Sequence, residues 1–171
     1  MKKVFLLLVA IASVLQVSAQ EKNNSLQDQT ATVSIDSLSI RLERLQHDFD
    51  FLSCDYQLQK LIMDLKDLSL AISNSSNGVV INVYTNSRYN RNLYNAYLNE
   101  YESDNSLFDT LKEHAKVLKA AVFVKMMTSG FSDEERSVLT KSLNVVDAAI
   151  ITVESSLNRY NIAIEAYRDL R

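Results

Sequence analysis

The sequence predicts an all-α protein, a long antiparallel three-helix coiled-coil bundle that follows an N-terminal signal peptide. The 171 residues include two glycines and no proline, so tight turns, which need a positive or a fixed φ, are few. Apolar residues also recur at alternating spacings of three and four, the period of helices packed in a bundle. A four-helix bundle with a break near Ser103 is the alternative.

The first 19 residues have the pattern of a signal peptide. Lys2 and Lys3 form a positive start, and positions 4–15 form an apolar stretch too short to span a bilayer. Small residues precede position 20, so we expect cleavage after Ala19 and an exported chain, periplasmic or extracellular. An uncleaved membrane anchor is the alternative. Gln20 stands where a bacterial lipoprotein has its acylated cysteine, so we expect no lipidation.

We expect residues 20–33 to form a flexible polar tether and residues 34–171 to form the bundle domain. Ser34 is the expected N-cap of the first helix, and the cluster 74–78 is its expected end. Two apolar series with heptad spacing run along this helix, offset by two residues. Either a bend or neighbours on two sides would accommodate the offset. The first series is Ile35, Leu38, Leu42, Leu45, Phe49, Leu52 and Tyr56. The second is Cys54, Leu58, Leu61, Leu65, Leu68 and Ile72.

The remaining chain predicts two further helices. Residues 79–85 are β-branched, but the spacing that follows favours one helix from 79 to about 128, continuous through Ser103. Gly130 is suited to a left-handed C-terminal cap, and Ser132 with Glu135 forms a capping box that opens the last helix. The apolar series of that helix is Leu139, Leu143, Val146, Ile150, Val153, Leu157, Tyr160, Ile164 and Tyr167.

Motifs that carry catalytic chemistry are missing from the sequence, so we expect no enzyme and no cofactor. The two histidines are far apart in the chain. Glu43, His47 and Asp50 can share one helix face, but such groups are common on solvated faces, and we expect no metal site.

Charge and cysteine content restrict the partners. Of the 18 basic residues, Lys2 and Lys3 leave with the signal peptide, so 16 basic residues face 21 acidic ones, a formal charge of −5. We therefore expect no nucleic-acid partner and no stable membrane insertion after cleavage. The single cysteine, Cys54, cannot form an internal disulfide, and we expect it to be buried.

The segment 84–101 is the most distinctive part of the chain, because it is dense in Tyr, Asn and Arg, which are common at binding surfaces. The candidate partner- or ligand-binding residues are Arg88, Tyr89, Arg91, Asn92 and Asn95. The expected function is that of an exported non-enzymatic interaction or scaffold protein, with a protein partner or self-association. The alternative is a helical module that binds a glycan or small ligand in a cavity within this segment.

Overall fold

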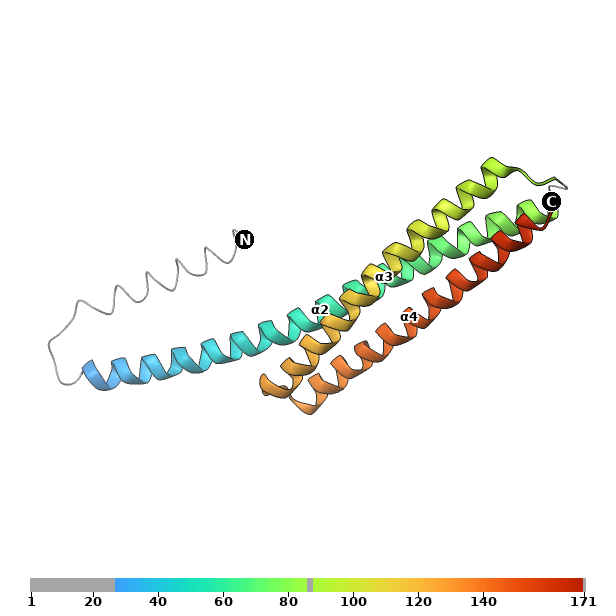
Figure 1. Cartoon of the computed structure of the whole chain (residues 1–171). Helices are drawn as coiled ribbons and strands as arrows, with labels where there is room; N and C mark the ends of the chain where they lie inside the picture. The colour runs from blue at the N-terminus through green and yellow to red at the C-terminus, as the bar shows by residue number, and fades with distance from the viewer. Residues whose placement is uncertain (1–26, 86–87, 171) are drawn as a thin grey trace. The chain divides into compact units, whose positions relative to one another are not determined.

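The computed structural model describes residues 27–85 and 88–170. The predicted signal peptide and the first part of the predicted tether lie outside them. Contacts divide the chain into two units, Met1–Leu45 and Gln46–Arg171. The described elements are three helices, α2 (Gln27–Thr85), α3 (Arg91–Thr128) and α4 (Asp133–Arg168) (Figure 1). The all-α class is confirmed.

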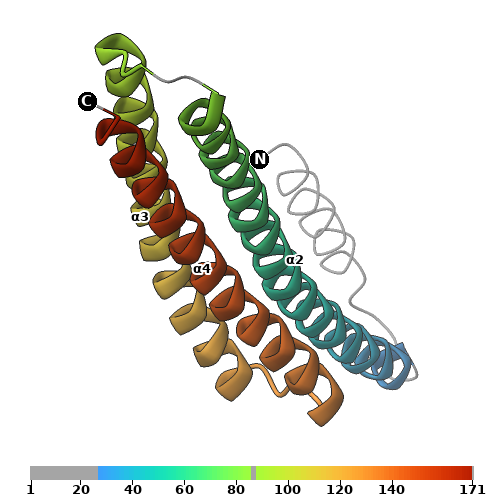
Figure 2. The same cartoon turned by 90° about the vertical axis from the view of Figure 1, so that its right-hand side faces the viewer.

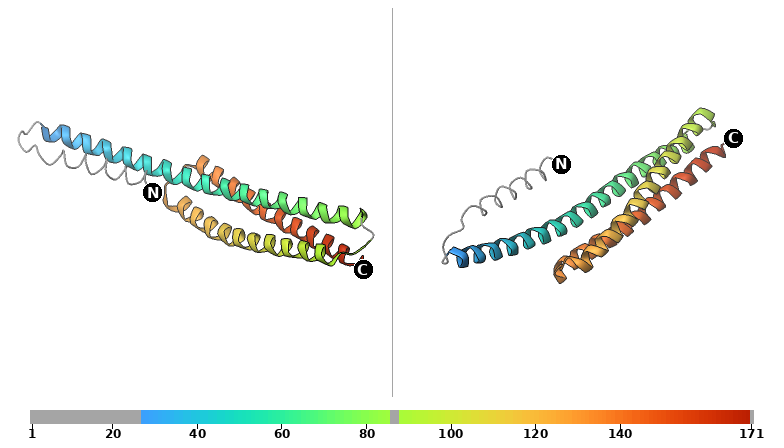
Figure 3. Two further views of the ribbon diagram at one scale, coloured as in Figure 1. Left: turned by 90° about the horizontal axis from the view of Figure 1, so that it is seen from above. Right: turned by 60° about the vertical axis from the view of Figure 1, so that its left-hand side comes forward.

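Within the second unit, α2, α3 and α4 lie side by side (Figures 2 and 3). Polar contacts between the helices show their directions. Along the contacts between α2 and α3, residue numbers rise in α2 and fall in α3. Along the contacts between α3 and α4, they rise in α3 and fall in α4. Neighbours in sequence are therefore antiparallel, and α2 and α4 run in the same direction. The contacts that show this are Ser75–Glu100 and Asn82–Tyr97 between α2 and α3, and Lys112–Glu154 and Lys119–Asp147 between α3 and α4.

The core of the second unit is built from the predicted apolar series. Every member of the second series of α2, from Cys54 to Ile72, is buried. The series of α4 is buried too, except that Leu143 and Ile150 are half-buried. Burying a Leu, Ile or Val side chain contributes about 1.5–3 kcal/mol each, so these faces account for much of the stability of the bundle. The expected burial of Cys54 is also confirmed.

The first series of α2 is not packed in the core, contrary to the prediction. Its seven side chains are between 50% and 69% exposed. The reason is visible at the turn between α3 and α4, where Phe131 contacts His47 and Phe51, with ring centroids 5.4 and 5.9 Å apart. A residue two positions from Phe51 or Cys54 lies about 200° around the helix, so Phe49 and Leu52 face the opposite way.

The limits of α2 also differ from the prediction. It begins at Gln27, within the predicted tether, and continues through the cluster 74–78 to Thr85. No proline or glycine occurs from 27 to 73 to stop the helix. At the cluster, tertiary contacts outweigh the weak local propensity: Ser76 and Val79 are buried, and Ser75 Oγ donates to Glu100 Oε1 at 2.6 Å.

The break between α2 and α3 lies after Thr85 and before Arg91, and not at 74–78. Residues 79–85 are helical, as expected, but they belong to α2, so the predicted continuous helix 79–128 is wrong. The four-helix alternative is wrong as well, because α3 passes Ser103 without a break. Between α3 and α4, Gly130 has φ 65°, and the Ser132–Glu135 capping box forms as predicted.

Candidate functional site

The predicted binding residues lie around the start of α3. Asn90 has an extended backbone, and its side-chain oxygen accepts the backbone N–H groups of Asn92 and Leu93 at 2.9 and 3.3 Å. Asn90 is therefore the N-cap of α3, which explains why a polar residue stands at this position. Arg91 is the first helical residue, and the first turn has no acidic residue.

The five candidates differ in exposure. Arg88, Arg91, Asn92 and Asn95 are exposed, whereas Tyr89 is half-buried. The Tyr89 ring lies 5.8 Å from that of Tyr94 and 6.0 Å from that of Tyr167. Tyr89 is thus part of the packing between the start of α3 and the end of α4, and four exposed polar side chains remain as ligand-binding candidates.

Most tyrosines of the segment 84–101 support the fold. The Tyr97 ring meets Tyr167 edge to face at 5.6 Å, and Tyr101 meets Tyr160 in the same manner at 5.9 Å. Tyr97 also accepts a hydrogen bond from the Asn82 side chain. Burial raises the pKa of Tyr97 above its usual value, which keeps the hydroxyl neutral.

A buried tyrosine contacts a carboxylate beside this ring cluster. The Tyr160 hydroxyl donates to Glu100 Oε2 at 3.0 Å, and Ser75 Oγ donates to Glu100 Oε1 at 2.6 Å. Burial, and then the Glu100 carboxylate, raise the pKa of Tyr160 far above its usual value. The raised pKa keeps the Tyr160 hydroxyl protonated at neutral pH, and its hydrogen bond to Glu100, with that of Ser75, joins α2, α3 and α4.

Asp50 and His47 of α2 contact residues at the turn between α3 and α4. Asp50 accepts from Lys125 Nζ at 2.8 Å and from Ser129 Oγ at 3.3 Å. The Lys125 hydrogen bond holds the pKa of Asp50 below its usual value, against the effect of burial. His47 Nε2 lies 3.4 Å from Glu135 Oε2. Over the described residues, no group of three His, Cys, Asp or Glu side chains is arranged to hold a metal ion.

The first apolar series of α2 forms a surface that we call the exposed heptad face: Ile35, Leu38, Leu42, Leu45, Phe49, Leu52 and Tyr56. Heptad spacing puts these side chains along one side of a continuous α2. Exposed apolar residues scattered singly are ordinary, whereas a stripe of this length is a candidate interaction surface. Its residues were found by sequence reasoning, although their burial was predicted wrongly.

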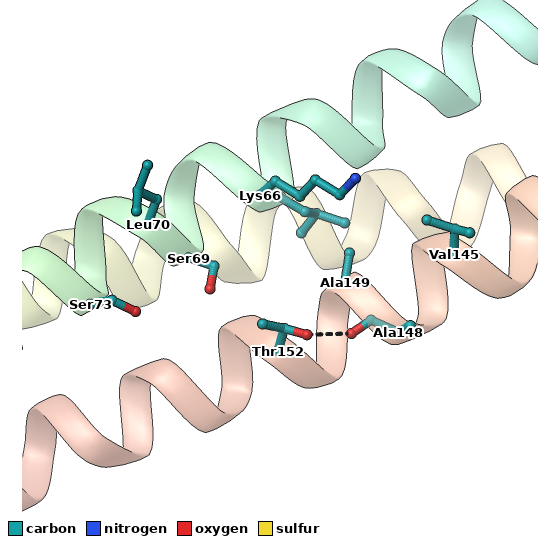
Figure 4. Close-up of a pocket in the computed structure, with 9 residues that line it drawn as sticks. Lys66, Ser69, Leu70, Ser73, Val145, Ala148, Ala149 and Thr152 are labelled. Atoms are coloured by element: carbon teal, nitrogen blue, oxygen red, sulfur yellow. Dashed lines mark hydrogen bonds between the residues drawn. The ribbon is translucent and has the colours of Figure 1, made fainter.

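The second surface is a groove between α2 and α4 that sequence reasoning missed. Its largest cavity has a volume of about 370 Å³, with Ser69 and Ser73 of α2 facing Thr152 and Ala149 of α4 (Figure 4). A small cavity and a further one of about 300 Å³ continue it, and neighbouring cavities share lining residues. The lining of the last cavity includes Tyr84.

The sequence signal for the groove is a second heptad spacing on α4. Val145, Thr152, Arg159 and Ala166 follow one another at intervals of seven, and all four line the groove. The stronger apolar series of α4, which fills the core, conceals this weaker one.

Two further findings concern the chain as a whole. Among the described helices, none is long and apolar enough to cross a membrane. Comparison of the chain with protein-family models, with curated proteins and with solved structures found no match.

Proposed function

We propose that this chain is an exported, non-enzymatic helical protein that acts by binding another protein chain. The exposed heptad face supports this proposal most directly, because it presents seven large apolar side chains at coiled-coil spacing. We propose that this face packs in coiled-coil fashion, with each side chain inserted between residues of a facing helix.

The size of the face is sufficient for specific association. Complete burial of a Leu, Ile or Phe side chain contributes about 1.5–3 kcal/mol, so seven of them supply on the order of 10 kcal/mol. Association costs about 4–15 kcal/mol through the loss of translational and rotational freedom, and this cost offsets most of the gain from burial. The face alone therefore supports a weak to moderate complex, and a tight one needs additional contacts.

Export rests on the sequence of residues 1–19 alone, which lie outside the described residues. Lys2, Lys3 and the apolar stretch 4–15 are typical of a signal peptide, and cleavage after Ala19 would release the chain into the periplasm or the medium. Expression of the full chain followed by intact mass measurement tests this proposal. Loss of residues 1–19 supports it, and a full-length mass with membrane retention contradicts it.

The interaction itself is tested by isolating the expressed chain with its bound proteins through a C-terminal tag. The double variant Leu42→Asp/Leu52→Asp places charges on the exposed heptad face and should lose the bound chains. The matched control is Val117→Asp, which alters a residue of α3 that is 66% exposed. If the double variant retains every associated chain at wild-type yield, the exposed heptad face is not the binding surface.

A second candidate function is that of a small-ligand or glycan-binding module. The observation that favours it is the cavity of about 300 Å³ between α2 and α4, which Tyr84, the first residue of the segment 84–101, helps to line. Tyr84 is 85% exposed, and an exposed aromatic face is suited to stacking against a sugar ring. Under this proposal, Tyr84→Ala should abolish binding in a glycan screen without a change in helicity, while Val117→Asp should bind normally.

A further inference from the structure

Within the second unit, the groove between α2 and α4 continues the side of α2 that carries Phe49, Leu52 and Tyr56 of the exposed heptad face. Leu42, Phe49 and Tyr56 follow one another at intervals of seven. Met63 and Leu70 continue this series, and both are more than 60% exposed. Leu70 lines the first cavity of the groove. A helix that follows the exposed heptad face along α2 would therefore lie in the groove over the second half of α2.

The exposed heptad face and the groove match in length. The face extends over 22 residues, from Ile35 to Tyr56, which is about 32 Å at the helical rise of 1.5 Å per residue. Along α2, the groove is lined from Leu65 to Tyr84, which is about 29 Å. One surface is a stripe of large apolar side chains, and the other is lined largely by small side chains. The two are complementary in shape as well as in length.

The charges of the two surfaces are complementary too. The charged residues that line the groove, Lys66 and Arg159, are both basic. Asp48 and Asp55 lie seven residues apart beside the exposed heptad face. Asp55 accepts a hydrogen bond from Ser142 of α4 at 3.5 Å, and the side chain of Asp48 is 68% exposed. A second copy of this chain supplies both the apolar stripe and the matching acids.

We propose that two copies of this chain form a closed antiparallel dimer, in which the exposed heptad face of each copy covers the α2–α4 groove of the other. In this register Leu52 lies opposite Leu70 of the second copy, and Asp48 lies at the level of Arg159. An antiparallel arrangement repeats each contact about a two-fold axis and covers both faces and both grooves. A parallel arrangement with the same contacts is head to tail and leaves one face and one groove uncovered.

This inference rests on the proposed function, since it names the chain that the exposed heptad face binds. Its test is a pair of measurements on the tagged protein isolated after expression of the full chain. Light scattering should give twice the mass of one chain. The double variant Leu52→Cys/Leu70→Cys, made with Cys54→Ala, should then form a disulfide-linked dimer under mild oxidation.

The cross-link can form only between copies. Positions 52 and 70 are about 27 Å apart along one helix, whereas the Cα atoms of a disulfide lie within about 7 Å. Leu52→Cys alone, in the Cys54→Ala background, is the matched control and should stay unlinked, because an antiparallel dimer separates the two copies of this position. Circular dichroism verifies that each variant retains its helicity.

A charge exchange tests the same register without altering Cys54. Asp48→Arg and Arg159→Asp should each weaken the dimer, by roughly tenfold, because each contact occurs twice and an exposed ion pair contributes up to about 1 kcal/mol. Both substitutions in one chain should restore it.

The possible results separate this inference from the proposed function. A doubled mass with the 52–70 cross-link and charge rescue supports the dimer. A monomer overturns it, and if that monomer still captures a different protein through the exposed heptad face, the proposed function stands. A dimer that links through position 52 alone is parallel and overturns the arrangement, as does a dimer without the 52–70 link.

Discussion

Replacing Tyr160 by Phe removes one hydroxyl from the core and leaves the ring in place. The ring is fully buried, and its edge contact with Tyr101 does not depend on the hydroxyl. The hydroxyl donates to Glu100 at 3.0 Å, and a hydrogen bond to a charged group contributes about 1.5–3 kcal/mol. Glu100 is exposed and keeps the hydrogen bond from Ser75. We therefore expect a loss of about 1.5 kcal/mol in unfolding free energy at neutral pH, at the lower end of that range.

The same substitution should change the response to alkaline pH. The pKa of Tyr160 is raised in the folded chain, so its hydroxyl stays protonated while the unfolded tyrosine ionises near pH 10. A raised folded-state pKa means that the contribution of the hydroxyl is complete below about pH 10 and declines as the pH rises, by about 1.4 kcal/mol per pH unit. The advantage of the wild type over Tyr160→Phe should therefore disappear near pH 11.

Urea unfolding followed by far-ultraviolet circular dichroism measures this difference at neutral pH and at several values up to about pH 11. The control is Tyr84→Phe, which alters a tyrosine that is 85% exposed and should follow the wild type at every pH. A constant difference between the wild type and Tyr160→Phe over the whole range would refute the reasoning. The folded and unfolded tyrosine would then titrate alike, and the hydroxyl would not be buried beside Glu100.

Three further predictions concern the core, the turn and the helix start. Leu65→Ala should lower the free energy of unfolding by about 2–5 kcal/mol because Leu65 is fully buried, whereas Leu70→Ala, at a residue 62% exposed, should change it little in the same guanidinium titration. Asp50→Asn should lower stability by about 1 kcal/mol at neutral pH. Because the folded pKa of Asp50 is depressed, this difference should shrink below about pH 4, as acid titration of both proteins will show. Ser132→Ala removes the N-cap of α4 and should lower the thermal midpoint, for a loss of about 1 kcal/mol.

Residue spacing alone predicted the buried faces of α2 and α4. The second series of α2 and the series of α4 each keep alternating three- and four-residue intervals, and the structure buries nearly all of their members. A helix that buries one side repeats apolar residues at its own period, but the same spacing in the first series of α2 did not lead to burial. The cap at Gly130 and the capping box at Ser132 were equally predictable, since both depend on local backbone geometry.

The break between α2 and α3 was not predictable in the same way. The cluster at 74–78 contains Asn, Ser and Gly, which weaken a helix locally. In the fold, Ser76 is buried and Ser75 donates to Glu100 of α3 at 2.6 Å, contacts that only the tertiary structure supplies. The break between α2 and α3 is instead marked by Asn90, the N-cap of α3.

The candidate sites show the same division between local and tertiary information. Composition drew attention to the segment 84–101, yet Tyr89, Tyr97 and Tyr101 take part in the packing of α3 against α4. The groove between α2 and α4 escaped prediction because its lining comes from two helices far apart in sequence. Lys66 and Arg159 look like ordinary surface cations until the fold places both in the lining of one groove.

The two apolar series of α2 require neighbours on two sides. An offset of two residues is about 200° around an α-helix, so the sides marked by Leu52 and Cys54 are nearly opposite. The structure gives α2 as one helix from Gln27 to Thr85. In the second unit, α3 and α4 cover the side of Cys54, and Leu52 remains 62% exposed. A heptad pattern does not distinguish a partner within the chain from a partner in another chain. Over residues 46–85 and 88–170, the packing of α3 and α4 covers the Cys54 side of α2, and the proposed second chain would cover the Leu52 side.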